Sequence, residues 1–138
     1  MTASTTFDPD AGRKRVRTGP IRVALIEPHR AMRASLRALL DDAGIDVVAE
    51  ADSPGQVPLR TLQERTPDVL VLDVSYLAGS ALSAIGALTR SAAQVPIVAI
   101  TMHADPAFAG AAISAGARAV VLKDLADSQL AEAVQAAA

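Results

Sequence analysis

Four polar residues stand directly after short apolar segments of the sequence, and their side chains carry reactive groups. Glu27, Asp73, Thr101 and Lys123 supply two carboxyl groups, a hydroxyl and an ammonium group. Asp73 follows the apolar segment 69–72, which is typical of a strand buried on both faces. Ligands and chemistry gather at the carboxyl ends of strands in open parallel sheets, so an acid there is placed for use. The alternative is an aspartate that only caps the turn after the strand.

The elements that must position these residues alternate along the chain. Strands are expected over residues 21–26, 46–51, 67–73, 95–100 and 118–122. Helices are expected over residues 30–43, from 52, over 80–90, over 105–116 and from 126 onward. Pro58 lies inside the second helix, which is therefore expected to start late or to be distorted. Five strands alternating with five helices through short loops predict a doubly wound, flavodoxin-like parallel sheet with the strand order 2-1-3-4-5.

The composition is that of one domain with an aliphatic core. Of the 138 residues, 51% are hydrophobic and only 2% are aromatic, so Ala, Val, Leu and Ile must build the core. The absence of cysteine excludes disulfide bonds, thiol catalysis and cysteine metal sites. A net charge of −2 provides no overall field that would attract nucleic acid or an anionic membrane.

The first residues differ from the rest of the chain. Residues 1–20 are polar and contain the basic cluster 13–17, so a disordered N-terminal tail is expected before a single domain over residues 21–138. No apolar run reaches the ~18 residues that a membrane span needs, and no signal sequence opens the chain. We therefore expect a cytoplasmic protein that contacts neither a membrane nor nucleic acid through these residues.

The residues at the strand ends, read with their flanks, resemble the receiver domain of two-component response regulators over residues 21–138. The match is close to the receivers of NarL/LuxR-type transcription factors in three segments, 67–73 (PDVLVLD), 100–105 (ITMHAD) and 115–124 (AGARAVVLKD). The resemblance implies the CheY-like form of the flavodoxin-like fold. It also implies a function in phosphorelay signal transduction.

The resemblance implies that a phosphoryl group is transferred to a carboxylate. Asp73 is the expected phosphoacceptor, which would attack the phosphohistidine of a sensor histidine kinase or a small phosphodonor. Lys123 would offer its positive charge, and Thr101 its hydroxyl, to the phosphoryl oxygens. A Mg²⁺ ion is expected on Glu27, Asp73 and the backbone carbonyl of Ser75. Beyond self-phosphorylation and self-dephosphorylation, no enzymatic activity is expected.

Several positions depart from the family pattern, among them the loop 76–81, which lacks the usual Pro-Gly pair and Asp-Gly. Receivers place two adjacent acids after the first strand, whereas this chain has Glu27 followed by Pro28, whose side chain has no ligand atom. Mg²⁺ is therefore expected to bind weakly. The aromatic residue that usually stands three positions before the lysine is Val120, so no ring can report phosphorylation. The sequence predicts an atypical receiver with slow, weak or absent phosphorylation, in which Asp73 and Lys123 form an ion pair.

Other functions stay open at this point. A phosphorylation-independent pseudo-receiver would act as a protein-interaction or dimerisation module. A flavodoxin-like small-molecule binder would need a phosphate-cradling loop after the first strand, where residues 27–29 offer an acid and a proline instead. The resemblance also implies a homodimer and a longer transcription regulator, whose helix-turn-helix domain lies outside this chain.

Overall fold

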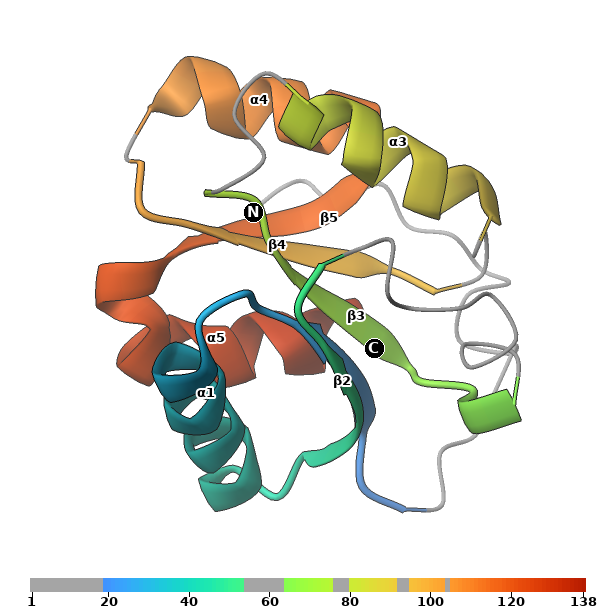
Figure 1. Ribbon diagram of the computed structural model, residues 1–138, viewed down its shortest axis with the longest axis vertical. Helices are drawn as coiled ribbons and strands as arrows, with labels where there is room; N and C mark the ends of the chain where they lie inside the picture. The colour runs from blue at the N-terminus through green and yellow to red at the C-terminus, as the bar shows by residue number, and fades with distance from the viewer. Residues whose placement is uncertain (1–18, 54–63, 76–79, 92–94, 104) are drawn as a thin grey trace.

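A five-stranded parallel sheet runs through the middle of the protein (Figure 1). The computed structural model describes residues 19–53, 64–75, 80–91, 95–103 and 105–138. The strands are β1 (Arg22–Ile26), β2 (Asp46–Ala51), β3 (Val69–Asp73), β4 (Ile97–Thr101) and β5 (Ala117–Leu122). Their order in the sheet is β2-β1-β3-β4-β5, and every neighbouring pair is parallel.

Helices cover both faces of the sheet, because a parallel strand pair must be joined by a crossover that packs back onto a face. Figure 1 shows α1 (Arg30–Asp42) and α5 (Ala126–Ala137) on one face, and α3 (Ala81–Ser91) and α4 (Pro106–Ala115) on the other. A single 3₁₀ turn, η4 (Lys123–Leu125), joins β5 to α5. Within the described ranges, no helix is both long enough and apolar enough to cross a bilayer.

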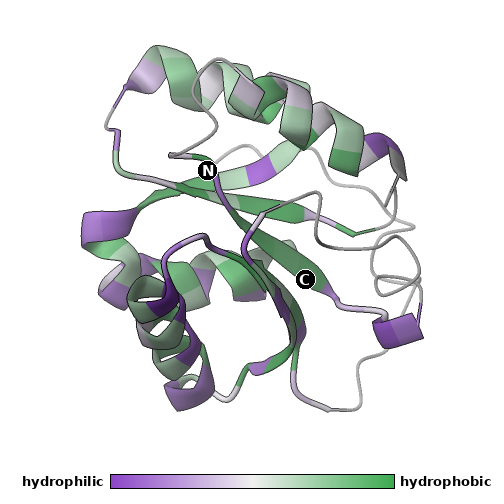
Figure 2. Ribbon diagram, viewed as in Figure 1, coloured by the Kyte–Doolittle hydropathy of each residue, from purple (hydrophilic) through white to green (hydrophobic). Residues whose placement is uncertain are grey.

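The two central strands are apolar along their length because both of their faces are covered. Every residue of β3 and of β4 is buried. Figure 2 accordingly shows these strands as hydrophobic, whereas hydrophilic residues lie along α1. The edge strand β2 is only partly buried, as its polar ends predict.

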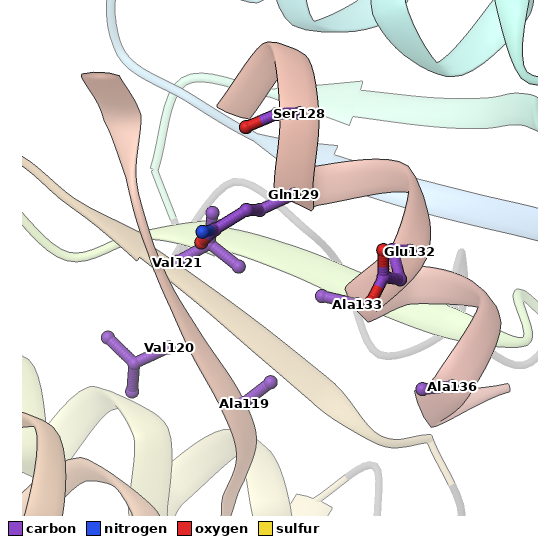
Figure 3. Close-up of a pocket in the computed structure, with 8 residues that line it drawn as sticks. All are labelled: Ala119, Val120, Val121, Ser128, Gln129, Glu132, Ala133 and Ala136. Atoms are coloured by element: carbon purple, nitrogen blue, oxygen red, sulfur yellow. The ribbon is translucent and has the colours of Figure 1, made fainter. Parts of the chain in front are cut away.

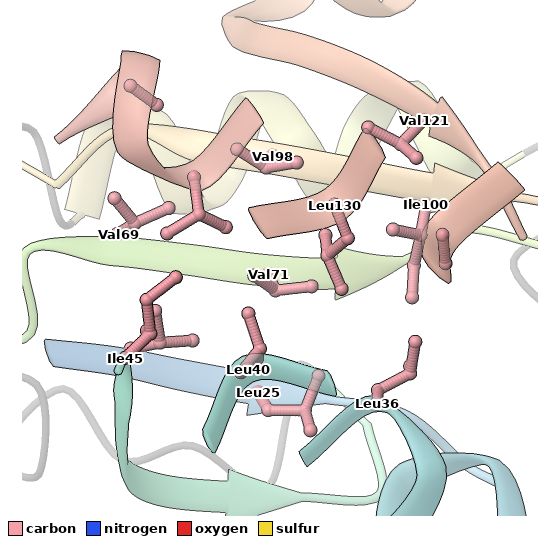
Figure 4. Close-up of a cluster of buried hydrophobic side chains, with 14 residues drawn as sticks. Leu25, Leu36, Leu40, Ile45, Val69, Val71, Val98, Ile100, Val121 and Leu130 are labelled. Carbon is pink, nitrogen blue, oxygen red and sulfur yellow. The ribbon is translucent and has the colours of Figure 1, made fainter. Parts of the chain in front are cut away.

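Two hydrophobic cores result, one on each side of the sheet. Alternate strand residues point to opposite faces, so Val69 and Val71 belong to one core and Leu70 and Leu72 to the other. Figure 4 shows the first core, which the helices α1 and α5 cover with Leu36, Leu40 and Leu130. The helices α3 and α4 close the second core.

The ends of α4 show how local sequence fixes an element. The Asp105 carboxylate accepts a hydrogen bond from the Ala107 amide at 2.9 Å, and Pro106 occupies the first turn. The helix ends at Gly116, whose φ of 129° is a conformation that side-chain-bearing residues rarely adopt. A similar glycine, Gly44 with a φ of 76°, follows α1.

The observed topology confirms the fold that the sequence predicts. All five strands occur in the expected order, and α1, α3, α4 and α5 begin within one residue of their expected starts. The sequence did not predict the 3₁₀ turn after β5. Of the expected second helix, the structure describes Glu64 and Arg65 as helical, while Pro58 falls outside the described residues. Most of the expected N-terminal tail, residues 1–18, also falls outside them.

Candidate functional site

The register of the sheet brings the four predicted residues to one edge. Leu72 pairs with Ile26, so Asp73, the last residue of β3, and Glu27, directly after β1, lie at the same level of neighbouring strands. Asp73 itself pairs with Ile100, and Thr101 pairs with Leu122, the residue before Lys123. All four residues are buried at the carboxyl ends of their strands. The glutamate is held to β2 as well, since its amide donates to the Ala51 carbonyl at 3.0 Å.

The central feature of the site is an ammonium group shared by two carboxylates. Lys123 Nζ lies 2.6 Å from Asp73 Oδ2 and 2.8 Å from Glu27 Oε1. The Lys123 side chain is 3% exposed, and both carboxylates are fully buried. Buried charges need a partner of opposite sign, and here one cation serves two anions. The predicted Asp73–Lys123 ion pair is therefore present, with Glu27 as its third member.

The remaining carboxylate oxygens bind backbone amides. Asp73 Oδ1 accepts from the Ser75 amide at 2.8 Å, and Glu27 Oε2 accepts from the His29 amide at 3.0 Å. Glu27 Oε1 binds no backbone amide among the described residues, and its contact there is the Lys123 ammonium at 2.8 Å.

Burial and charge shift the acidities of two of these groups. Burial raises the pKa of Glu27 above its usual 4.5, and the hydrogen bond from Lys123 offsets this only in part. Burial alone would lower the pKa of Lys123 from 10.5, but the bonds to Asp73 and Glu27 outweigh it and raise that pKa. The lysine therefore stays charged at neutral pH.

Two hydroxyl groups organise the loop that follows β4. The Thr101 hydroxyl accepts a hydrogen bond from the His103 amide at 3.1 Å. The Ser75 hydroxyl, on the loop after β3, accepts one from the Met102 amide at 2.9 Å. Thr101 thus follows Ile100, the register partner of Asp73, and its hydroxyl oxygen is turned to its own loop. Ser75 links that loop to the acid-bearing one.

A cation from α1 supports the position of Glu27. Arg33 donates to the Glu27 carbonyl at 2.7 Å and to Asp52 Oδ1 at 2.8 Å, and it lies 3.4 Å from Glu50 Oε1. Glu50 belongs to β2 and Asp52 follows it, so Arg33 ties α1 to the ends of β1 and β2. The sequence interpretation missed this role, although Arg33 follows Glu27 by six residues and faces two acids.

The donor set suits a divalent cation only in part. Glu27 and Asp73 offer carboxylate oxygens at neighbouring strand ends. Within the described ranges, however, no group of three or more His, Cys, Asp or Glu residues could hold a metal ion. Pro28 adds no ligand atom, and the Lys123 ammonium contacts both acids. A metal would share these carboxylates with a resident cation.

A shallow groove lies apart from these side chains, between β5 and α5 (Figure 3). Ala119, Val120 and Val121 of β5 line it together with five α5 residues between Ser128 and Ala136. Val120, which stands at the expected aromatic position, is half-buried and packs against the core under α3 and α4. The groove has one charged residue, Glu132, and none of the four residues of the ion-paired edge.

Fold and site together place the protein in the class of flavodoxin-like α/β domains with an acidic cluster at the carboxyl edge of the sheet. The chain belongs to the response regulator receiver domain family, because the model of that family matches residues 23–135. Domains of this family are generally not classical enzymes.

The curated relatives are response regulators. The chain is 31% identical to Response regulator UvrY of Escherichia coli K12 over 83% of its length and 53% of the relative. It is 35% identical to Response regulator GacA of Pseudomonas viridiflava, over 84% of the chain and 53% of that protein. The chain therefore spans about half the length of these relatives.

The solved structures agree. The crystal structure of a LuxR-family two-component response regulator from Aurantimonas sp. SI85-9A1 has a TM-score of 0.76 and 31% identity, covering 86% of this chain and 84% of the other. The receiver domain of the putative regulator NarL from Mycobacterium tuberculosis, at 24% identity and a TM-score of 0.74, shares the fold; the alignment covers 86% of this chain and 96% of that one. The predicted NarL/LuxR-type receiver is confirmed.

Proposed function

We propose that the chain is a signal-receiving domain in which Asp73 is the phosphoacceptor and Mg²⁺ binds weakly. The observation that carries this proposal is the buried contact of Lys123 with Asp73 at 2.6 Å. A lysine that already lies against the acid is positioned to hold the negative charge that a phosphoryl group would add. Thr101, on the neighbouring strand and next to the register partner of Asp73, supports the same assignment.

The reaction requires one bond to form and one to break. A carboxylate oxygen of Asp73 attacks the phosphorus, and the bond from phosphorus to the donor nitrogen of a phosphohistidine breaks. The electron pair of that bond returns to the donor, and Asp73 becomes an acyl phosphate. Lys123 then compensates the phosphoryl charge, while the Thr101 hydroxyl donates to a phosphoryl oxygen and releases the His103 amide.

Glu27, Asp73 and the carbonyl of Ser75 would hold the Mg²⁺ ion. When bound, this ion supplies positive charge that neutralises the phosphoryl oxygens. Two carboxylates are fewer than the family pattern provides, and Lys123 competes for both of them. We infer that this chain binds the ion more weakly than receivers that have an acid in place of Pro28.

Intact-protein mass measurement tests the phosphoacceptor. The protein is incubated with acetyl phosphate and Mg²⁺, beside an Asp73→Asn variant as the matched control. We expect a gain of one phosphoryl mass in the original chain and none in the variant. No gain under any divalent metal would refute the proposal, and an equal gain in the variant would refute the choice of Asp73.

A second candidate is a phosphorylation-independent interaction module. The ion-paired triad favours it, because Lys123 already neutralises the acids and fixes one arrangement without a phosphoryl group. Under this alternative, Asp73→Asn leaves the oligomeric state measured by light scattering unchanged, with or without phosphodonor. A phosphorylation-dependent change in that state would exclude the module.

The partners follow from the family. We propose a sensor histidine kinase or a small phosphodonor upstream, self-association into a homodimer, and a DNA-binding domain of the same regulator outside these residues. A flavodoxin-like small-molecule binder has less support, because residues 27–29 form no glycine-rich phosphate loop.

A further inference from the structure

One side chain joins the loop that follows Asp73 to the loop that follows Thr101. The Ser75 amide donates to Asp73 Oδ1 at 2.8 Å, and the Ser75 hydroxyl accepts from the Met102 amide at 2.9 Å. The backbone amide of Ser75 therefore binds the Asp73 carboxylate, and the Ser75 hydroxyl binds the loop after Thr101. The sequence interpretation considered only the carbonyl of this residue.

The hydroxyl acts where the backbone ladder ends. The Val74 amide donates to the Ile100 carbonyl at 2.9 Å, which continues the pairing of β3 with β4. One residue further, the acceptor for the Met102 amide is the hydroxyl of Ser75 in place of a strand carbonyl. An alanine at position 75 would provide no such acceptor, whereas a threonine would keep one.

We propose that Ser75 is a positioning residue that couples the state of the Asp73 carboxylate to the loop between β4 and α4. The proposal rests on the proposed function in one respect, because phosphorylation is taken as the reaction that changes the Asp73 carboxylate. Turning the carboxylate into an acyl phosphate takes the full negative charge from the group that the Ser75 amide binds, so that hydrogen bond weakens. Ser75 then shifts, and its hydroxyl carries Met102 with it. Met102 is 61% exposed, so the shift reaches the protein surface.

A double-mutant cycle tests the coupling without any phosphodonor. Hydrogen exchange at the Met102 amide is measured in the original chain, in Ser75→Ala, in Asp73→Ala and in the double variant. We expect Ser75→Ala to speed this exchange roughly five- to tenfold, the worth of one hydrogen bond, and Ser75→Thr to restore it. Asp73→Ala should speed the exchange in the original chain and have no further effect in Ser75→Ala.

Two results would overturn the proposal. If the exchange rate at the Met102 amide is unchanged in Ser75→Ala, the Ser75 hydroxyl does not protect that amide. If the effects of the two substitutions are fully additive, Asp73 and Ser75 are not coupled. If Asp73→Ala does not fold, Asp73→Asn replaces it in the cycle, because it also removes the charge that the Ser75 amide binds.

A second arm separates this proposal from the phosphoacceptor proposal. Beryllium fluoride with Mg²⁺, a mimic of an acyl phosphate, should shift the amide resonance of Met102 more in the original chain than in Ser75→Ala, where only the route through Thr101 remains. A response elsewhere in the site with an equal Met102 shift in both proteins would refute the coupling alone. No response anywhere in the original chain would count against the phosphoacceptor and leave the cycle to decide on Ser75.

Discussion

At the residue scale, the behaviour of the site depends on the 2:1 ratio of buried acids to buried cation. Lys123 contacts Asp73 and Glu27 at 2.6 and 2.8 Å, and all three side chains are buried. Removing the cation from this cluster leaves two buried negative charges that neither water nor a partner compensates, whereas removing one acid leaves a matched ion pair. The first three predictions concern this balance.

The first prediction is that Lys123→Met is strongly destabilising at neutral pH. Two buried carboxylates then lack their cation, and such losses typically reach about 3–5 kcal/mol in the free energy of unfolding. Urea denaturation measures the change. The same substitution in a Glu27→Gln, Asp73→Asn background should cost far less, because no buried charge remains. Equal losses in both backgrounds would show that packing is responsible.

The second prediction concerns the pH dependence of the free energy of unfolding, and it follows from the raised pKa of Glu27. A raised folded-state pKa gives a stability contribution that is complete below the unfolded value of 4.5 and is lost as pH rises through the folded pKa. Glu27→Gln lacks this titration, so its stability relative to the original chain should increase as pH rises from 4.5. Unfolding free energies measured across this window check the sign, and a difference that shrinks with rising pH would contradict it.

The third prediction restores the missing acid. Pro28→Asp should raise the affinity for Mg²⁺ about tenfold or more, because a second carboxylate joins the donor set after β1. Calorimetric titration with Mg²⁺ measures the affinity. Pro28→Ala is the matched control, since it removes the ring without adding an acid. An equal gain in both variants would point to the loop backbone as the cause.

At the element scale, the ends of the helices are fixed by a few residues with special conformations. Gly116 ends α4 with a φ of 129°, and a Cβ built on it would lie 2.3 Å from Thr89 Oγ1 of α3. Gly44 has a φ of 76°, but a Cβ there would meet nothing within 4 Å. The two glycines therefore separate backbone strain from steric conflict.

The fourth prediction uses this pair. Gly44→Ala should cost about 1 kcal/mol, from backbone strain alone. Gly116→Ala should cost more, about 2–3 kcal/mol, because α3 and α4 must also move apart. Thermal unfolding of both variants makes the comparison. Equal losses would show that Thr89 yields without cost.

The elements also show what the sequence can predict. The hydrophobic pattern located the central strands, because β3 and β4 are built mostly of apolar residues. The capping residues located the start of α4, because Asp105 and Pro106 begin that helix. The strand ends then predicted which residues would meet. The sharing of Lys123 by two acids and the bond from Met102 to Ser75 were not predictable, because they depend on side-chain directions set by the 3₁₀ turn and by neighbouring loops.

At the scale of the whole molecule, the sheet separates two cores that contribute to one fold. Leu130 is fully buried in the core under α1 and α5, and Ile85 is fully buried in the core under α3 and α4. Both cores are built on the same strands, since consecutive residues of β3 point into opposite ones. A change in either core must therefore affect the whole sheet.

The fifth prediction is that Leu130→Ala and Ile85→Ala each lower the global free energy of unfolding by about 2–5 kcal/mol. Each variant should still unfold in a single transition when the amide signals of α5 and those of α3 are followed as two probes. Transitions that separate between the two probes in one variant would show that one layer of helices melts independently.

The cation of the site comes from the outermost strand on its side of the sheet. β5 has a single strand neighbour, β4, and Lys123 follows it directly. Edge strands detach more readily than central ones, and detachment of this one would withdraw the ammonium while Glu27 and Asp73 remain on inner strands. Detachment of β5 is opposed because it would leave the carboxylates of Glu27 and Asp73 to repel each other. Detachment of β5 and loss of the Lys123 charge from the site therefore occur together. Alkaline pH that deprotonates Lys123 should accordingly loosen β5 before the other strands.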